Sequence, residues 1–226
     1  ESHGVQIAQH WMSAHDLPRA FDATVRAMLS SSTLAPATAA QLGERAIDLW
    51  PQVPDAAEVA GRPLERLMHE TAREHMAADN APRAAAIWES ALATCPPEET
   101  LMRAEILTEK AVCDHERGLE VEAPLEEALR LLEGCPETPE IIRQRSHATA
   151  TLAICGSDLT ERTHSHELAL EAVELALRAG SPSDAARAAT FAARLQVMKG
   201  EFEDGLAAFD EARAHLPDDP LVNWRH

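Results

Sequence analysis

Apolar residues recur every three or four positions along most of the chain, the spacing that places them on one face of an α-helix. Proline stands at the start of several of these segments, and glycine or a polar residue follows their ends. The clearest boundary is residues 180–184, where Gly180 ends one helix, Ser181 caps the next and Pro182 occupies its first turn. The pattern predicts helices at residues 4–14, 17–29, 36–50, 63–78, 81–94, 98–117, 123–132, 139–155, 160–179, 182–199 and 201–215. The chain is therefore predicted to be all-α, with about eleven helices.

Small, aromatic and proline residues recur in a way that groups these helices into hairpins. With Gly200 or Asp79 at the turn between two helices, five positions carry the residue types of a tetratricopeptide repeat, a helical hairpin of about 34 residues. Small residues are needed where the two helices touch, and the aromatic residue fills the gap toward the next hairpin. The two sets are Ala193, Gly205, Phe209, Ala212 and Pro217, and Ala72, Ala84, Trp88, Ala91 and Pro96. We therefore predict a tetratricopeptide-like superhelix, an α-solenoid.

The remaining repeats are less regular. Turns at Gly118 and Gly156 fit the same pattern only in part, which favours repeats with altered helix lengths. Another hairpin is expected to turn at His15-Asp16. Residues 51–63 hold three prolines and Gly61 and are predicted to form a loop or a hinge. We expect one helical-repeat domain over residues 1–226, with a possible break near 51–63. The chain begins without methionine, so we also expect it to be a piece of a longer protein.

The net charge and the cysteine content exclude some classes of function. Lys+Arg 20 against Asp+Glu 38 gives a net charge of -18, which argues against direct nucleic-acid binding by this segment. The four cysteines form no C-x-x-C pair and fit a reduced, cytoplasmic protein. The longest apolar stretch, around residues 148–155, is far shorter than the ~20 residues of a membrane span. Neither a signal peptide nor membrane insertion is expected.

Two segments near the N-terminus resemble a family of regulators. IAQHWMSAHDLPRAFDA at residues 7–23, followed by LGERAIDLW at 42–50 and VPDA at 53–56, is similar to the region after the ATPase in large LuxR-family, STAND-type regulators. The resemblance implies a parent protein with an ATPase, these repeats as its signal-sensing and partner-binding part, and a C-terminal DNA-binding domain. The chain itself has no G-x-x-x-x-G-K-[ST] motif and no basic helix-turn-helix. We expect a sensor or protein-interaction domain, and the alternative is a free-standing adaptor that binds a peptide or protein.

Catalytic and metal-site patterns are weak. His69 and His75 are six residues apart, so they face opposite sides of a helix, whereas a zincin motif needs a spacing of four. No nucleophile elbow and no Cys/His arrangement typical of a protease is present. We therefore expect no enzyme activity, no bound metal and no cofactor.

Positions 2, 5, 9 and 12 of each first helix commonly point into the concave groove of such repeats, and they supply the candidate binding residues. They are Arg66, His69, Arg73 and Met76 in one repeat and Arg187, Thr190 and Arg194 in another, with Met198 beside the last position. The guanidinium group suits carboxylates and phosphates, so the predicted partner is an acidic peptide, a protein or a small anionic effector, and a homo-oligomer is possible. Arg66 and Arg73 are equally explained as surface residues that pair with Glu70 of their own helix. The middle repeat places Glu105, Thr108 and Val112 at positions 2, 5 and 9, so no continuous arginine ladder is expected.

Three tryptophans could either bind a ligand or pack in the core. Trp11, Trp50 and Trp88 could serve as ligand platforms, but their helical spacing favours packing between hairpins. We predict that Trp88, at the aromatic position of its repeat, is a core residue.

Overall fold

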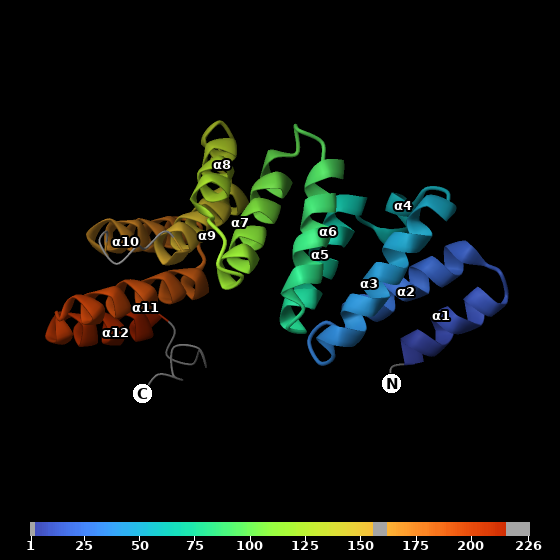
Figure 1. Cartoon of the computed structure of the whole chain (residues 1–226), viewed down its shortest axis with the longest axis horizontal. Helices are drawn as coiled ribbons and strands as arrows, with labels where there is room; N and C mark the ends of the chain where they lie inside the picture. The colour runs from blue at the N-terminus through green and yellow to red at the C-terminus, as the bar shows by residue number, and fades with distance from the viewer. Residues whose placement is uncertain (1–2, 156–161, 216–226) are drawn as a thin grey trace. The chain divides into compact units, whose positions relative to one another are not determined.

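A computed structural model describes residues 3–155 and 162–215. Within these ranges the chain is helical, without strands, and it divides into two compact units, Glu1–Met102 and Arg103–His226 (Figure 1). The helices are α1 (His3–Ser13), α2 (Leu17–Ser31), α3 (Pro36–Leu49), α4 (Ala56–Ala60), α5 (Leu64–Ala77), α6 (Ala81–Thr94), α7 (Thr100–Glu116), α8 (Glu122–Glu133), α9 (Pro139–Cys155), α10 (Arg162–Arg178), α11 (Pro182–Lys199) and α12 (Phe202–His215), with a 3-10 turn, η1 (Trp50–Gln52). The all-α prediction and the predicted helix positions are confirmed, and the structure contains one helix, α4, that was not predicted.

Unit 1 contains two full hairpins and one that is cut short. Helices α1 and α2 pack on each other, as do α5 and α6, and α3 packs between α2 and α5. In place of a full second helix paired with α3, the chain has η1 and the five-residue α4, and α4 packs on α2. Residues 51–63, predicted to be a loop or hinge, therefore contain a short helix whose Ala56 and Ala60 are buried. Whether residues 1–226 form a single domain stays a prediction.

Unit 2 stacks its helices in chain order. Helix α9 contacts α8, α10 and α11, and α11 in turn contacts α10 and α12. Because α9 and α11 are the first helices of successive hairpins, their contact places hairpin beside hairpin, as a solenoid requires.

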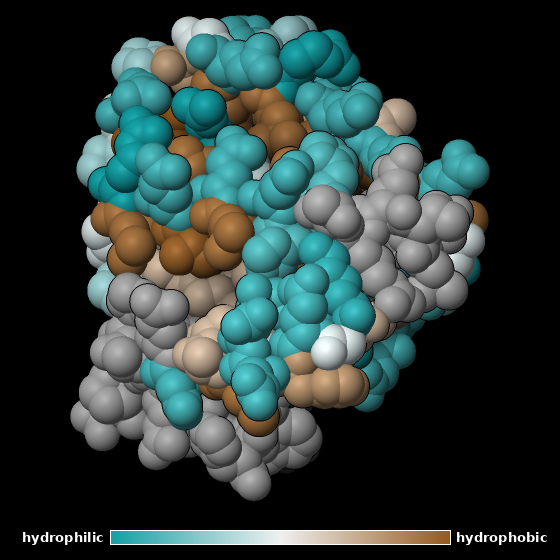
Figure 2. Space-filling view, turned by 90° about the vertical axis from the view of Figure 1, so that its left-hand side faces the viewer, coloured by the Kyte–Doolittle hydropathy of each residue, from teal (hydrophilic) through white to brown (hydrophobic). Residues whose placement is uncertain are grey.

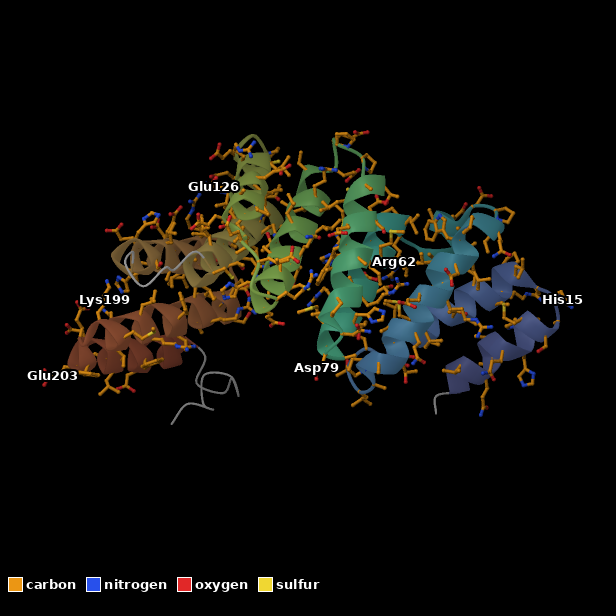
Figure 3. All side chains as sticks on the ribbon, viewed as in Figure 1. His15, Arg62, Asp79, Glu126, Lys199 and Glu203 are labelled. Carbon is orange, nitrogen blue, oxygen red and sulfur yellow. The ribbon has the colours of Figure 1, made fainter. Side chains whose placement is uncertain are left out.

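The predicted repeat register is confirmed at the turns. His15, Asp79, Gly118 and Gly200 all have φ between 56° and 90°, the left-handed conformation that ends a helix. Figure 3 shows His15 and Asp79 at the tips of their hairpins, where the chain reverses direction. The turns therefore separate the helices where the pattern of small residues predicts.

The packing positions of the repeats agree with this register. In the hairpin of α5 and α6, the side chains at the small and aromatic positions are completely buried: Ala72, Ala84, Trp88 and Ala91. In the hairpin that turns at Gly200, Ala193 and Gly205 are buried and Phe209 is partly buried. The side chain of Ala212, Pro217 and the predicted turn at Gly156 lie outside the described residues.

Gly205 of α12 lies close against α11. A Cβ atom there would lie 2.5 Å from Val197 Cγ2 and 3.1 Å from the carbonyl oxygen of Ala193. Gly205→Leu is therefore expected to lower the free energy of unfolding by about 1–3 kcal/mol through overpacking. Gly134→Leu is the control because a Cβ at Gly134 meets nothing within 4 Å. Urea unfolding followed by circular dichroism measures both variants, and equal midpoints would contradict this packing.

Glu44 of α3 contacts one side chain on α5 and one on α6. Its Oε1 accepts a hydrogen bond from Arg83 Nε and lies 2.9 Å from His75 Nε2. The hydrogen bond from Arg83, followed by its positive charge, lowers the pKa of Glu44 below its ordinary value. A carboxylate whose pKa is lower in the folded state stabilises the fold above its unfolded pKa, and that contribution disappears as pH falls through the folded pKa.

Glu44→Gln is accordingly expected to cost about 0.3–1 kcal/mol at pH 7, since the pair is only partly buried. Because the unmodified chain loses this contribution below the folded pKa of Glu44, the difference between the two proteins should shrink as the solution is acidified to about pH 3. Urea unfolding at both pH values measures the change. An equal difference at pH 7 and pH 3 would assign the cost to packing rather than to charge.

Candidate binding groove

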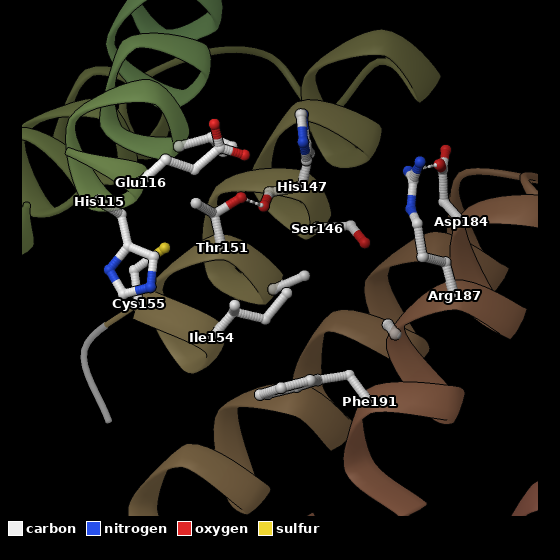
Figure 4. Close-up of a pocket in the computed structure, with 13 residues that line it drawn as sticks. His115, Glu116, Ser146, His147, Thr151, Ile154, Cys155, Asp184, Arg187 and Phe191 are labelled. Atoms are coloured by element: carbon white, nitrogen blue, oxygen red, sulfur yellow. Dashed lines mark hydrogen bonds and ion pairs between the residues drawn. The ribbon is translucent and has the colours of Figure 1, made fainter. Parts of the chain in front are cut away.

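The first helices of three successive hairpins, α7, α9 and α11, line a groove in unit 2. Its volume is about 290 Å³, and all of its described lining residues belong to this unit. Figure 4 shows the lining side chains converging from the three helices. We refer to this site as the α7–α9–α11 groove.

Buried polar contacts fix the walls of the groove. Gln144 of α9 donates from Nε2 to the carbonyl oxygen of Ala104 at 3.3 Å and to Thr108 Oγ1 at 3.0 Å, both on α7. On the other side, the hydroxyl of Ser146 donates to the carbonyl oxygen of Ala172 on α10 at 2.7 Å. These bonds hold α9 at a set offset from both neighbours, because a buried polar group that loses its partner costs about 1–3 kcal/mol.

Apolar side chains form one side of the groove. Ile154 of α9 is 43% exposed, and Phe191 of α11 lies opposite it with one face on the buried Ala153, Ala169, Ala192 and Leu195. Ala150 and Ala188 complete this surface with small side chains that leave it open. An apolar side chain of a ligand would remove Ile154 and Phe191 from water, which is the principal favourable term in association.

Charged groups stand at the two ends. Arg187 forms an ion pair with Asp184, and the hydroxyl of Ser181 donates to the other oxygen of Asp184 at 2.6 Å. His115, Glu116 and Cys155 lie at the opposite end (Figure 4). An extended ligand would therefore meet an apolar centre with polar groups on either side.

The thiol and hydroxyl groups that line the groove are not arranged as nucleophiles. Burial, together with the negative charge of Glu116, raises the pKa of the Cys155 thiol to about 11, so the thiol is protonated at neutral pH and is a poor nucleophile. The hydroxyls of Ser146 and Thr151 both donate to backbone carbonyl oxygens. Across residues 3–155 and 162–215, no three histidine, cysteine or acidic side chains are grouped so that they could hold a metal ion.

The candidate residues of unit 1 fall into different surroundings. His69 is only 4% exposed, and its Nδ1 accepts a hydrogen bond from Trp88 Nε1 at 3.0 Å. His69 was predicted to face a groove, and this is wrong because the buried indole takes it as a hydrogen-bond acceptor. Arg73 is exposed and lines a separate polar hollow of about 390 Å³ with Glu70 and Glu74, while Arg66 and Met76 are partly buried.

Among the candidates in unit 2, Arg187 is the one that lines the α7–α9–α11 groove. Thr190 donates its hydroxyl to the carbonyl oxygen of Ala186, and Arg194 and Met198 are exposed farther along α11. The same positional rule does find other lining residues. Val112 and His115 occupy positions 9 and 12 of α7, and Ser146 and Ala150 occupy positions 5 and 9 of α9. Sequence reasoning missed most of them because it favoured the two regular repeats, whereas the groove lies mainly on the irregular ones.

The stacked hairpins and the groove along their first helices define an α-solenoid of tetratricopeptide-like repeats. No known protein family and no curated protein matches the sequence. None of the helices in the described part of the chain is long and apolar enough to cross a membrane.

Solved structures of similar fold support this class. BtubC (BKLC) from P. vanneervenii has a TM-score of 0.67 at 15% identity, over 99% of this chain and 89% of that protein. A putative kinesin light chain from Podosopora anserina with nearly identical TPR-like repeats has a TM-score of 0.53 at 18% identity, over 95% of this chain and 97% of that one. A substituted form of the same Podosopora anserina protein has a TM-score of 0.55 at 17% identity, over 95% of this chain and 96% of that one. At these identities the likeness establishes the fold alone.

Proposed function

We propose that the chain is a protein-interaction scaffold whose unit 2 binds an extended segment of a partner in the α7–α9–α11 groove. The observation that carries this proposal is the groove itself, with an apolar centre at Ile154 and Phe191 between two polar ends. Cys155 is protonated at neutral pH and Ser146 is engaged with the backbone, which also favours recognition over chemistry.

Arginines on α11 suggest the character of the partner. Arg187 and Arg194 are seven residues apart, so they lie on one face of the helix, and both are exposed. A partner carboxylate could replace Asp184 as the ion-pair acceptor of Arg187 and form a bidentate contact. We therefore propose a segment with an apolar anchor residue followed by an acidic residue. In unit 1, Arg66, Arg73 and Met76 remain proposed contact residues for an anionic ligand.

The proposal also concerns the kind of protein in which this scaffold works. The resemblance of residues 7–56 to LuxR-family regulators favours a sensor domain of an ATP-dependent transcriptional regulator, located in the cytoplasm, and the alternative is a free-standing adaptor. Because the ATPase and DNA-binding motifs are absent from this sequence, the isolated chain is expected neither to hydrolyse ATP nor to bind duplex DNA. The genomic sequence on either side distinguishes the two settings, since only the regulator requires a P-loop upstream and a helix-turn-helix downstream.

The groove is tested with an array of peptides of about 12 residues that carry one apolar and one acidic residue at varied spacing. Peptides that bind are titrated against the chain and its Ile154→Ser variant by fluorescence anisotropy. We expect the substitution to weaken binding at least about tenfold, a loss of about 1.4 kcal/mol. Leu34→Ser is the control, because Leu34 is 89% exposed and belongs to unit 1 rather than to the groove. Equal affinities of the two variants and the unmodified chain would place the binding site elsewhere.

A further inference from the structure

The last helix of unit 2 presents an apolar stripe to solvent. Phe202 and Leu206 are four residues apart on α12, so they share a face, and each is 62% exposed. Figure 2, which views the end of unit 2 that carries α10, α11 and α12, shows apolar side chains at the surface between hydrophilic ones. Large apolar side chains exposed together in this way mark interaction surfaces.

In the first hairpin of the chain, the two positions that correspond to Phe202 and Leu206 are covered. With His15 at the turn of the first hairpin, the positions of Phe202 and Leu206 correspond to Leu17 and Phe21 of α2. Phe21 is completely buried, Leu17 packs against the same core, and the elements that follow, η1 and α4, cover that face of α2. In the hairpin that turns at Asp79, the position of Leu206 is taken by Ala85, which is buried. Phe202 and Leu206 thus stand at positions that pack against following elements in the first hairpin, whereas in the described part of the chain both side chains remain largely exposed.

The charges around the stripe define what would pack there. Glu201, Glu203, Asp204 and Asp210 are all exposed, and Lys199 is the cationic residue among the described side chains of residues 199–210. A helix with acidic flanks would be repelled by this rim, whereas lysine or arginine beside an apolar face would form ion pairs with it. The net charge of -18 would also draw a basic segment toward the chain over a longer range.

We propose that the α12 stripe, Phe202 and Leu206, docks a basic amphipathic helix of a partner. The apolar face of that helix covers the two side chains, in the place that η1 and α4 occupy on α2. Its lysine or arginine residues lie against the acidic rim. This surface is separate from the α7–α9–α11 groove, so the two can be tested independently.

The test uses two fluorescein-labelled peptides of about 18 residues with the same leucine stripe at helical spacing, one with lysine flanks and the other with glutamate flanks. Fluorescence anisotropy should show saturable binding of the lysine peptide that weakens as salt is raised, and at least about tenfold weaker binding of the glutamate peptide. Phe202→Ser and Leu206→Ser should each reduce the affinity for the lysine peptide at least about tenfold. Because both side chains are exposed, these variants should keep the circular dichroism spectrum and the unfolding midpoint of the unmodified chain.

Leu34→Ser supplies the matched control, since it removes an exposed leucine that is distant in the sequence from α12, and it should leave the affinity unchanged. Equal weakening by Leu34→Ser would overturn the proposal in favour of nonspecific attraction to an acidic protein. Failure of the lysine peptide to bind would overturn it directly. Concentration-dependent self-association that Leu206→Ser abolishes, seen by sedimentation velocity without peptide, would also overturn it and assign the stripe to a second copy of the chain.

Discussion

Replacing Trp88 with alanine is expected to lower the free energy of unfolding of unit 1 by about 3–5 kcal/mol. The Trp88 side chain is completely buried between α5 and α6, and its indole donates to His69 Nδ1 at 3.0 Å. The substitution therefore leaves a cavity and also removes a hydrogen-bond donor from a buried histidine. Urea unfolding followed by fluorescence measures the effect, because Trp11 and Trp50 remain as probes in the same unit.

Trp88→Phe separates the two contributions. Phenylalanine keeps much of the apolar volume but removes the indole N–H, so about 1–3 kcal/mol should be lost with the hydrogen bond to His69 Nδ1. The two variants should then differ clearly in stability, with the alanine variant lower. A Trp88→Ala variant that unfolds at the midpoint of the unmodified chain would refute the repeat register at this hairpin.

A comparable loss, about 3–5 kcal/mol, is expected for Phe21→Ala. Phe21 is completely buried in the core of α2 and α3, and its ring meets that of Trp50 edge-on, with 5.7 Å between centroids and 82° between planes. Because Trp50 begins the segment that replaces a full second helix, this contact ties the shortened hairpin to α2. Urea unfolding followed by tryptophan fluorescence should report the loss of stability.

Phe202→Ala serves as the matched control, since it removes the same side chain from an exposed site on α12. The substitution should change the free energy of unfolding by less than about 0.5 kcal/mol. If both phenylalanine variants lost equal stability, the core position of Phe21 would be wrong.

The hairpin architecture could be predicted from the sequence because its signals are local. Left-handed turns at Asp79 and Gly200, and small residues such as Ala72 and Ala84 at fixed offsets from them, reflect contacts within one hairpin. Helix α4 was missed because the prolines and glycine around it are also typical of a loop. Its single turn is stabilised by packing of Ala56 and Ala60, a tertiary contact that local pattern does not contain.

The groove was harder to predict because it depends on three hairpins at once. Its apolar residues, Ile154 and Phe191, come from separate hairpins, and either could equally belong to a core. His69 was assigned to the groove although it is buried. Its position in the repeat indicates an exposed face, but its side chain accepts a hydrogen bond from the buried Trp88. Positional rules predict which way a helix faces, but the side chain across the interface decides whether a residue is available to a ligand.

The buried amide of Gln144 has a consequence for the kinetics of recognition. Its two hydrogen bonds to α7 fix how far α9 can slide along its neighbour, since sliding by one residue would break both. The groove beside it is therefore formed before a partner arrives, and binding requires little reordering of its walls. A partner and the groove should then associate as rigid bodies, with association rate constants of about 10⁵–10⁷ M⁻¹s⁻¹. Partners of different affinity should therefore differ chiefly in their dissociation rates.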